Sequence, residues 1–246
     1  MKTGIMSAML EEMESLLEVM DITSTQEKGN RTYYSGMLWG HEVVLVFSRW
    51  GKVASATTAT HLIIEHKVDR ILFSGVAGAL DPRLNVGDIV IGTKLYQHDM
   101  DARPIFPQFE IPLVHTSYFE TDEDLRNQLK SAAISFLESN TIDEATKETF
   151  KIHHPKIMEG AIASGDRFIS DAKDAEHIKQ LLPDLLCVEM EGAAVAQVCS
   201  DYNIPFALIR TISDAADDNA TIDFQAFVKE VATVYTHGIL ISFLNA

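Results

Sequence analysis

The chain has 246 residues, of which 46% are hydrophobic and 23% are charged, as is ordinary for a soluble globular protein. Its formal net charge of −16 argues against nucleic acid as a partner, because nucleic-acid binding depends on Lys and Arg side chains that neutralise phosphates. The length is enough for one large α/β domain with a substantial buried core.

Two further features concern the cellular compartment. Cys187 and Cys199 both fall in apolar segments, so we expect buried thiols in a reducing compartment and no disulfide. Glu11 and Glu12 come too early for a secretory signal, and no uninterrupted apolar run approaches the roughly 18 residues that span a bilayer. We therefore expect a cytoplasmic protein with no membrane partner.

Strand and helix patterns alternate along the whole chain. Short apolar or β-rich runs predict strands at residues 3–7, 31–38, 42–47, 70–74, 86–95, 156–163, 185–190 and 205–212. Apolar side chains at helical spacing predict helices at residues 8–20, 53–66, 122–139, 172–182, 192–203 and 224–244. Since no linker or repeat divides the chain, we expect residues 1–246 to form one α/β domain with a mostly parallel or mixed sheet.

Four other segments carry weaker signals. Residues 75–78 (GVAG) follow a buried strand and predict a loop whose small side chains let a ligand approach the backbone. Residues 102–113 contain three prolines and predict a long loop or lid, and the polar residues 141–151 are expected to be mobile. Residues 98–101 (HDMD) are of metal-ligand types, but no matching His or Cys cluster completes a site, so no metal is expected.

Four carboxylates fall where a ligand crevice is expected. In an α/β sheet this crevice lies outside the carboxyl ends of the strands. Glu189 and Glu191 stand at a strand-to-helix junction, where a Glu can equally be a solvated or capping group, and Asp214 ends an apolar strand. Glu12 lies on the border of the apolar face of the first helix, where it could be partly buried or could reach water.

Several carboxylates without a nucleophilic Cys or a metal cluster suggest acid–base chemistry. One carboxyl group can protonate a leaving group while another activates water. Asp214 is the natural acid, because burial and the like charges of the acidic loop 214–218 would raise its pKa above the usual value of about 3.9. Glu12 or Glu191 would stay ionised if Arg210 is close. The same acidic loop could equally be solvated and inert.

Six motifs occur in order along the chain: residues 4–12 (GIMSAMLEE), 51–53 (GKV), 74–78 (SGVAG), 164–169 (SGDRFI), 188–193 (VEMEGA) and 210–214 (RTISD). Together they resemble the bacterial 5′-methylthioadenosine/S-adenosylhomocysteine nucleosidases, of the purine nucleoside phosphorylase superfamily. The resemblance covers nearly the full length and implies a single-domain, three-layer α/β sandwich with a mixed central sheet. It also implies a homodimer that needs no cofactor or metal and hydrolyses the N-glycosidic bond of a 5′-thio-substituted adenosine.

The resemblance implies catalytic roles for five residues. Asp214 would protonate adenine N7 while Ser213 holds its side chain, and Glu12 would position and deprotonate the attacking water. Glu191 would hydrogen-bond the ribose hydroxyls, and Arg210 would orient the carboxylate and water network. Adenine is a poor leaving group as an anion, so its protonation lets an oxocarbenium-like ribosyl group form, which nearby anionic groups stabilise.

The implied substrate contacts are Val76, Ala77, Gly78, Phe168, Ile169, Glu189, Met190 and Phe224. Phe168 would stack on adenine, and the backbone of Ile169 would read the edge of the base. Met190 would pack under the sugar, and Phe224 would close the apolar end near the 5′ substituent.

Two departures from the family pattern leave the 5′ substituent open. Val76 stands where many family members have Ser. The loop 102–113 differs from the commonest pattern, in which a subunit partner contributes an apolar side chain to this pocket, although Ile105 or Phe106 could do so. Methylthioadenosine, S-adenosylhomocysteine, 5′-deoxyadenosine and aminodeoxyfutalosine are therefore all candidate substrates.

Two other functions are compatible with these motifs. A phosphorylase needs cationic or backbone donors for phosphate, whereas Glu11 and Glu12 follow the first strand and would repel it. Arg49 or Arg83 would weaken this argument if either turned into the pocket. A protein that binds a nucleoside without turnover would not need both Glu12 and Asp214.

Overall fold

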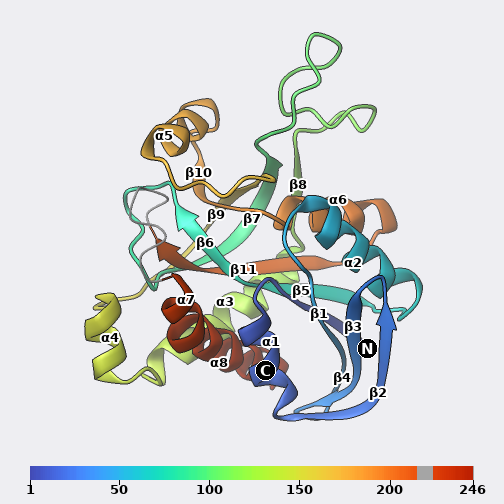
Figure 1. The fold of residues 1–246 in the computed structure, drawn as a ribbon, viewed down its shortest axis with the longest axis vertical. Coiled ribbons are helices and arrows are strands. Elements are labelled where there is room, and N and C mark those ends of the chain that lie inside the picture. Colours follow the sequence, from blue (N-terminus) through green and yellow to red (C-terminus); the bar gives the residue numbers. More distant parts are fainter. Residues whose placement is uncertain (215–223, 246) are drawn as a thin grey trace.

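The computed structural model describes residues 1–214 and 224–245, and its centre is an 11-stranded mixed sheet (Figure 1). The strands are β1 Thr3–Ser7, β2 Met20–Lys28, β3 Arg31–Leu38, β4 His41–Phe47, β5 Arg70–Ser74, β6 Val76–Ala79, β7 Ile89–Gln97, β8 Tyr118–Glu120, β9 Ile157–Ser164, β10 Leu185–Glu189 and β11 Phe206–Asp214. Their spatial order is β2-β3-β4-β1-β5-β11-β6-β10-β9-β7-β8. The helices are α1 Leu10–Leu17, α2 Lys52–Ile64, α3 Glu123–Glu138, α4 Glu144–Phe150, α5 Ala172–Leu181, α6 Gly192–Tyr202, α7 Phe224–Phe227, the π-helical turn η1 Val228–Ala232 and α8 Thr233–Leu244.

Helices cover both faces of this sheet. Helices α2 and α6 pack together on one face, whereas α1, α3 and α8 pack on the other (Figure 1). Ile5 and Met6 of β1 show how one strand contributes side chains to the hydrophobic cores on both faces of the sheet. Ile5 packs with the residues of α1, α3 and α8, and Met6 packs with those of α2 and α6, because successive strand side chains point to opposite faces. The predicted three-layer, single-domain α/β fold with a mixed sheet is confirmed.

The carboxyl ends of several parallel strands meet at one edge of the sheet. Strand β1 runs parallel to both β4 and β5, and Ser7 lies opposite Phe47 on one side and Ser74 on the other. Strand β11 runs parallel to β5 and β6, and it ends opposite Gly78. The segments that follow these strands are therefore neighbours in space, as the sequence analysis assumed.

Two predictions for the first part of the chain were wrong in detail. The first helix ends at Leu17, and Met20 begins β2, in which every later residue is exposed. The backbone of this strand pairs with β3, and this pairing holds the strand in place although its sequence lacks the apolar alternation that marks a half-buried strand. Residues 76–79 form β6 and not a loop, because their backbone pairs with β10 and β11.

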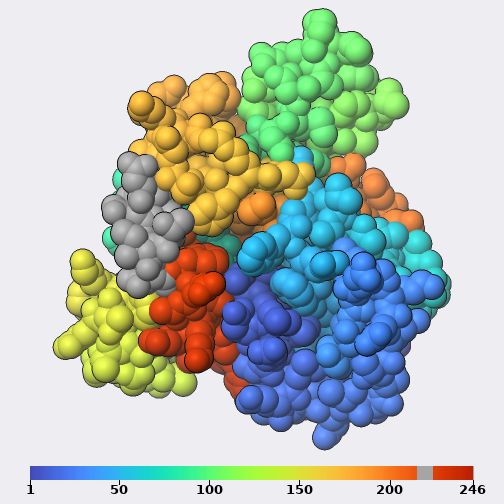
Figure 2. Space-filling view, viewed as in Figure 1, coloured from blue at the N-terminus to red at the C-terminus, as the bar shows by residue number. Residues whose placement is uncertain are grey.

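Two central segments also bear on the predictions. The polar segment 141–151 contains α4, which begins where the Asp143 side chain accepts a hydrogen bond from the Thr146 amide. Between Gln97 and Tyr118 the structure has no helix or strand, which confirms the long loop predicted at 102–113. This segment projects from the body of the molecule and forms the green projection in the space-filling view (Figure 2).

The C-terminal helical segment runs from Phe224 to Leu244 and is interrupted by the π-helical turn. By length and mean hydropathy it could cross a membrane, but 56% of its most apolar 18-residue window is buried inside the structure. It therefore has the character of a core helix, and it packs against α1 and α3. Cys187 and Cys199 are both buried and unpaired, as predicted.

Candidate active site

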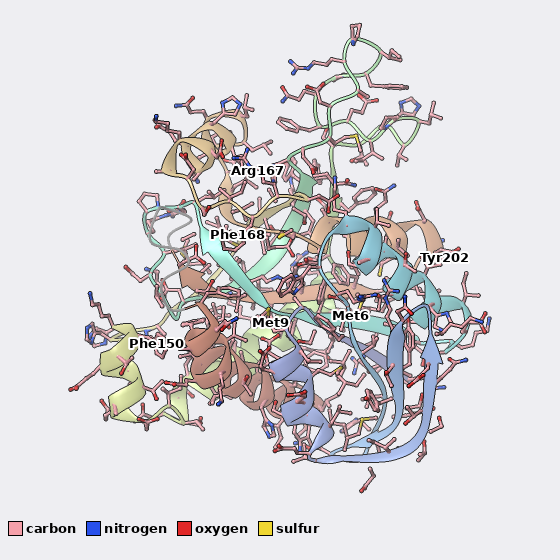
Figure 3. All side chains as sticks on the ribbon, viewed as in Figure 1. Met6, Met9, Phe150, Arg167, Phe168 and Tyr202 are labelled. Carbon is pink, nitrogen blue, oxygen red and sulfur yellow. The ribbon has the colours of Figure 1, made fainter. Side chains whose placement is uncertain are left out.

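A cavity of about 320 Å³ opens where the parallel strands end. All of the predicted site residues except Glu12 and Arg210 line it. Met9 and Phe168 are far apart in the sequence, yet both line this cavity, and Figure 3 shows them near the two ends of β6. The structure thus brings together segments that the sequence could compare only as separate strand ends.

Asp214 is the last residue of β11, and it lines the cavity. The Ser213 hydroxyl donates a hydrogen bond of 2.6 Å to Oδ2 of Asp214 and lies 3.4 Å from the carbonyl oxygen of Ala77. Because Asp214 pairs with Gly78 of β6, its carboxyl group is held beside the wall formed by residues 76–78. The sequence analysis expected the negative charges of residues 217 and 218 to raise the pKa of Asp214, but these two residues lie outside the described part of the chain.

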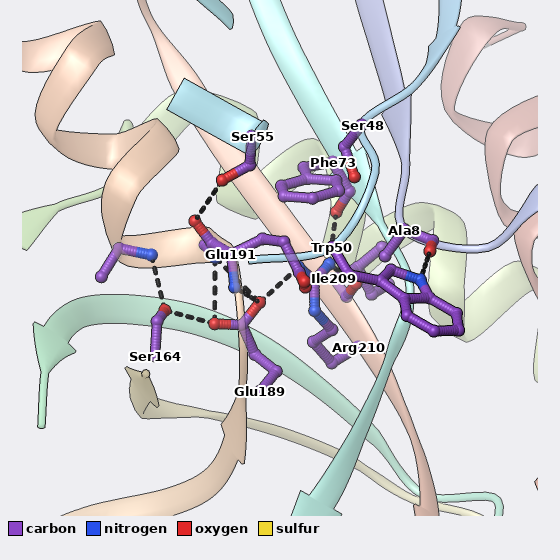
Figure 4. A network of polar contacts seen from close by, with 12 residues as sticks. Ala8, Ser48, Trp50, Ser55, Phe73, Ser164, Glu189, Glu191, Ile209 and Arg210 are labelled. Carbon is purple, nitrogen blue, oxygen red and sulfur yellow. Dashed lines mark hydrogen bonds and ion pairs between the residues drawn. The ribbon is translucent and has the colours of Figure 1, made fainter. Parts of the chain in front are cut away.

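A buried ion pair lies behind the cavity wall. Nη2 of Arg210 is 2.6 Å from Oε2 of Glu189, and the two side chains are 0% and 2% exposed (Figure 4). Oε2 of Glu189 also accepts a hydrogen bond of 2.8 Å from the Gly192 amide, and Oε1 accepts one from the Ser164 hydroxyl. Glu189 therefore occupies the start of α6, where free N–H groups and the helix dipole favour a carboxylate. Glu189 borders the cavity, but protein donors engage both of its oxygens.

Glu191 is the N-cap residue of α6 and also lines the cavity. Its Oε1 accepts a hydrogen bond of 2.9 Å from the amide of Gly51, in the loop after β4. A glycine is needed there, because φ is +90° and a Cβ atom would lie 2.9 Å from the Asp166 side chain. Burial and the negative charge of Glu189 raise the pKa of Glu191 to about 7, so this group titrates near neutral pH.

Glu12 lies on α1 and has no exposed surface. The hydroxyls of Ser7 and Thr236 lie 2.6 and 2.8 Å from its Oε2 and Oε1, respectively. Burial raises the pKa of Glu12, whereas the two hydroxyls and the charge of Arg210 lower it. Of the two possibilities that the sequence left open, burial is correct. Glu12 stands behind the wall to which Met9, three residues earlier, contributes.

Aromatic and apolar side chains form much of the remaining wall. The rings of Phe168 and Phe224 meet edge to face with 6.1 Å between their centroids. Met9 and Trp50 also line the cavity, and the sequence analysis did not select them. The indole N–H of Trp50 donates a hydrogen bond of 2.9 Å to the Ala8 carbonyl (Figure 4). Trp50 comes shortly after the end of β4, and this position was a signal that could have identified it.

The cations near the cavity are few. Neither Arg49 nor Arg83 lines it, and Arg83 forms an ion pair of 2.8 Å with Asp81. Among the described residues, Arg167 is the only cation in the wall. Its guanidinium group forms an ion pair with Asp174 on α5.

Two other sets of candidates lie outside the cavity. Neither Ile105 nor Phe106 lines it within this chain, and Ile105 is 81% exposed on the projecting loop. Asp99, in the run 98–101, forms an ion pair of 2.6 Å with Lys52. Within residues 1–214 and 224–245, no group of three or more His, Cys, Asp or Glu side chains is arranged to hold a metal ion.

Comparison with known protein families agrees with this architecture. The family model of the phosphorylase superfamily matches residues 2–245 of the chain. The protein therefore belongs to the phosphorylase superfamily.

Three proteins to which the chain is similar are nucleosidases. The chain is 34% identical to an aminodeoxyfutalosine nucleosidase of Campylobacter jejuni, over 98% of this chain and 97% of the relative. It is 33% identical to a 5′-methylthioadenosine/S-adenosylhomocysteine nucleosidase of Staphylococcus aureus, over 93% of each chain. The crystal structure of the Neisseria meningitidis 5′-methylthioadenosine/S-adenosylhomocysteine nucleosidase with methylthio-immucillin-A superposes with a TM-score of 0.87 and 32% identity, covering 99% of this chain and 98% of that one. These relatives confirm the resemblance inferred from the six motifs.

Proposed function

We propose that the protein hydrolyses the N-glycosidic bond of 5′-substituted adenosines such as 5′-methylthioadenosine and S-adenosylhomocysteine, and so releases adenine. The observation that carries this proposal is the pair of carboxyl groups in one cavity, with Asp214 fixed by Ser213 and Glu191 fixed by Gly51. The reaction named for the relatives in both comparisons supports the same assignment.

Asp214 is the proposed acid for the leaving group. A proton delivered to adenine N7 lets the base depart as a neutral molecule, and a positioned acid contributes about 10²–10⁴ to the rate. Ser213 fixes the carboxyl group, and the half-exposed ring of Phe168 offers a flat apolar face on which adenine can stack.

The other carboxylates act on the sugar and the water. As the C–N bond breaks, positive charge develops on the ribosyl group, and Glu191 lies in the wall where it can bind the ribose hydroxyls. Water then attacks the anomeric carbon and gives its proton to Glu12, which lies behind the wall beside Met9, so this step requires that part of the wall to admit the water. The Arg210 charge favours the ionised form of both Glu12 and Glu191, and the Glu189–Arg210 pair fixes Arg210 in place.

Water is favoured over phosphate as the nucleophile by the charges of the wall. Phosphate binding needs free cations or convergent backbone donors. Arg167 is the only cation of the wall in the described part of the chain, and it is paired with Asp174. The carboxylate of Glu191, when ionised, would also repel phosphate.

The test is adenine release from 5′-methylthioadenosine with and without inorganic phosphate. Hydrolysis predicts the same rate in both conditions and free methylthioribose as the product. A strict requirement for phosphate, with methylthioribose 1-phosphate as the product, would identify a phosphorylase. Tight binding of the nucleoside without adenine release would identify a binding protein.

We also propose a cytoplasmic homodimer in which the projecting loop of one subunit meets the other subunit. Ile105 and Leu113 support the dimer, because both are apolar and at least 80% exposed on this loop, and a second subunit packed on the loop would remove them from water. The two free cysteines support a reducing compartment. Sedimentation equilibrium tests the dimer, and a monomer at micromolar concentration would exclude it.

The preferred 5′ substituent is a separate question. Comparing turnover of methylthioadenosine, S-adenosylhomocysteine, 5′-deoxyadenosine and aminodeoxyfutalosine would identify it.

A further inference from the structure

Thr236 on the C-terminal helix reaches Glu12 near the start of the chain. Its buried hydroxyl donates a hydrogen bond of 2.8 Å to Oε1 of Glu12, the only acceptor that this hydroxyl has among the described residues. The Ser7 hydroxyl, by contrast, lies 2.6 Å from Oε2 of Glu12 and 2.8 Å from the Met9 carbonyl oxygen. A hydroxyl has one proton, so Ser7 divides its donation between two acceptors, whereas Thr236 serves the carboxylate alone.

The hydroxyl of Thr236 also differs from those of other helical threonines in this protein. Thr57, Thr60 and Thr149 each donate a hydrogen bond of 2.8 Å to the carbonyl oxygen four residues earlier. This bond within the helix is the usual one for a helical threonine. Thr236 gives its proton to Glu12 instead, so its rotamer is set by the carboxylate and not by its own helix.

A π-helical turn directly precedes α8, the helix that carries Thr236 to Glu12. Residues 228–232 form this turn, and the Thr233 hydroxyl bonds the Val228 carbonyl five residues earlier at 3.0 Å. A π-helical turn adds one residue to an otherwise α-helical segment, and so it changes the direction in which every later side chain points. Phe224 precedes the turn and lines the cavity, while Thr236 follows it and reaches Glu12.

We propose that Thr236 is a positioning residue for the hydrolytic step, because its hydroxyl fixes the orientation in which the Glu12 carboxylate receives the proton of the attacking water. The proposal rests on the proposed role of Glu12 as the base. Each carboxylate oxygen can accept two hydrogen bonds, so Oε1 can accept from Thr236 and from a water at the same time.

The same contact has a consequence for the pH dependence of the reaction. The groups that face the Glu12 carboxyl are the hydroxyl of Ser7 from β1, the hydroxyl of Thr236 from α8, the guanidinium of Arg210 from β11 and the backbone of Met9. Each of them lowers the pKa of Glu12 against the larger effect of burial, which raises it. Loss of the Thr236 hydroxyl should therefore move the acid limb of the kcat/KM profile to higher pH, by about one to two pH units for a hydrogen bond to a charged group.

The experiment measures kcat and KM for 5′-methylthioadenosine from pH 5 to 9 in the parent protein and in three variants. Thr236→Val removes the hydroxyl at nearly constant volume, and Thr236→Ser retains it. Thr233→Val is the matched control, because it removes a hydroxyl of the same helix whose proton stays within that helix. We expect Thr236→Val to shift the acid limb upward and to lower kcat at pH 7 with little change in KM, whereas the other two variants should match the parent protein.

Three outcomes would overturn the proposal: an unshifted profile for Thr236→Val, no recovery with Thr236→Ser, or the same shift in Thr233→Val. If Thr236→Val does not fold, Thr236→Cys, a weak donor of similar size, should show the same direction of shift. Glu12→Gln separates the two levels of inference. If this variant keeps its turnover, the role of Glu12 as the base fails. If it loses turnover while Thr236→Val keeps the parent profile, only the positioning role fails.

Discussion

Glu191 allows a direct test of the electrostatics of the site through the Glu191→Gln variant. The substitution removes the charge but keeps the side-chain length and the oxygen that accepts the Gly51 amide at 2.9 Å. The ordinary pKa of this carboxyl group is 4.5, and burial together with the charge of Glu189 raises it to about 7 in the folded protein.

The sign of the stability change follows from proton binding. Between pH 4.5 and about 7 the folded protein binds more protons at Glu191 than the unfolded chain does. The contribution of Glu191 to the free energy of unfolding is therefore fully present below pH 4.5, and it is lost as the pH rises to the folded pKa of about 7. A shift of roughly 2.5 pH units at about 1.4 kcal/mol per unit amounts to about 3 kcal/mol. Glu191→Gln should thus unfold with nearly the parent free energy at pH 4.5 and with about 3 kcal/mol more at pH 8.

Urea denaturation at intervals from pH 4.5 to 8.5 measures this difference. Glu14→Gln is the matched control, because it makes the same change on the exposed side of α1, outside the cavity wall. We also expect Glu191→Gln to be much less active despite its higher stability, because it loses the proposed contact with the ribose hydroxyls. Equal gains at pH 4.5 and pH 8, or a loss of stability at pH 8, would refute the reasoning.

Two further substitutions distinguish a residue that takes part in catalysis from one that stabilises the fold. Asp214→Asn should lower kcat by about 10²–10⁴ while nucleoside binding stays nearly unchanged, since Ser213 can still donate to the amide oxygen. Stopped-flow or calorimetric binding beside steady-state kinetics measures both effects, and unchanged turnover would remove Asp214 from the mechanism. Glu189→Ala leaves the charge of Arg210 buried and unpaired, so it should lower the free energy of unfolding by about 3–5 kcal/mol. Urea denaturation is the assay, and a loss below about 1 kcal/mol would mean that solvent or another group compensates Arg210.

The sequence predicted most accurately those elements whose burial leaves a pattern in the chain. Strands β1 and β10 are buried at every position, and both were predicted within one residue of their observed ends. Strand β2 was missed, because only Met20 of its residues is buried. Strand β6 was taken for a loop, since four small residues form a strand there only through the pairing partners that other parts of the chain supply.

Some residues of the candidate site could likewise be predicted from the sequence, whereas the surroundings of others could not. Asp214 and Glu191 could be selected because Asp214 ends one buried strand and Glu191 follows another, and strand ends in an α/β sheet converge on one edge. The sequence by itself determined the fold class and the kinds of chemical groups available to the site, since both are written in local patterns of residues. Only the tertiary structure decided that Glu12 is fully buried and which hydroxyls hold it. The environment of a carboxylate depends on what surrounds it in space, and Thr236 is brought to Glu12 from the opposite end of the chain.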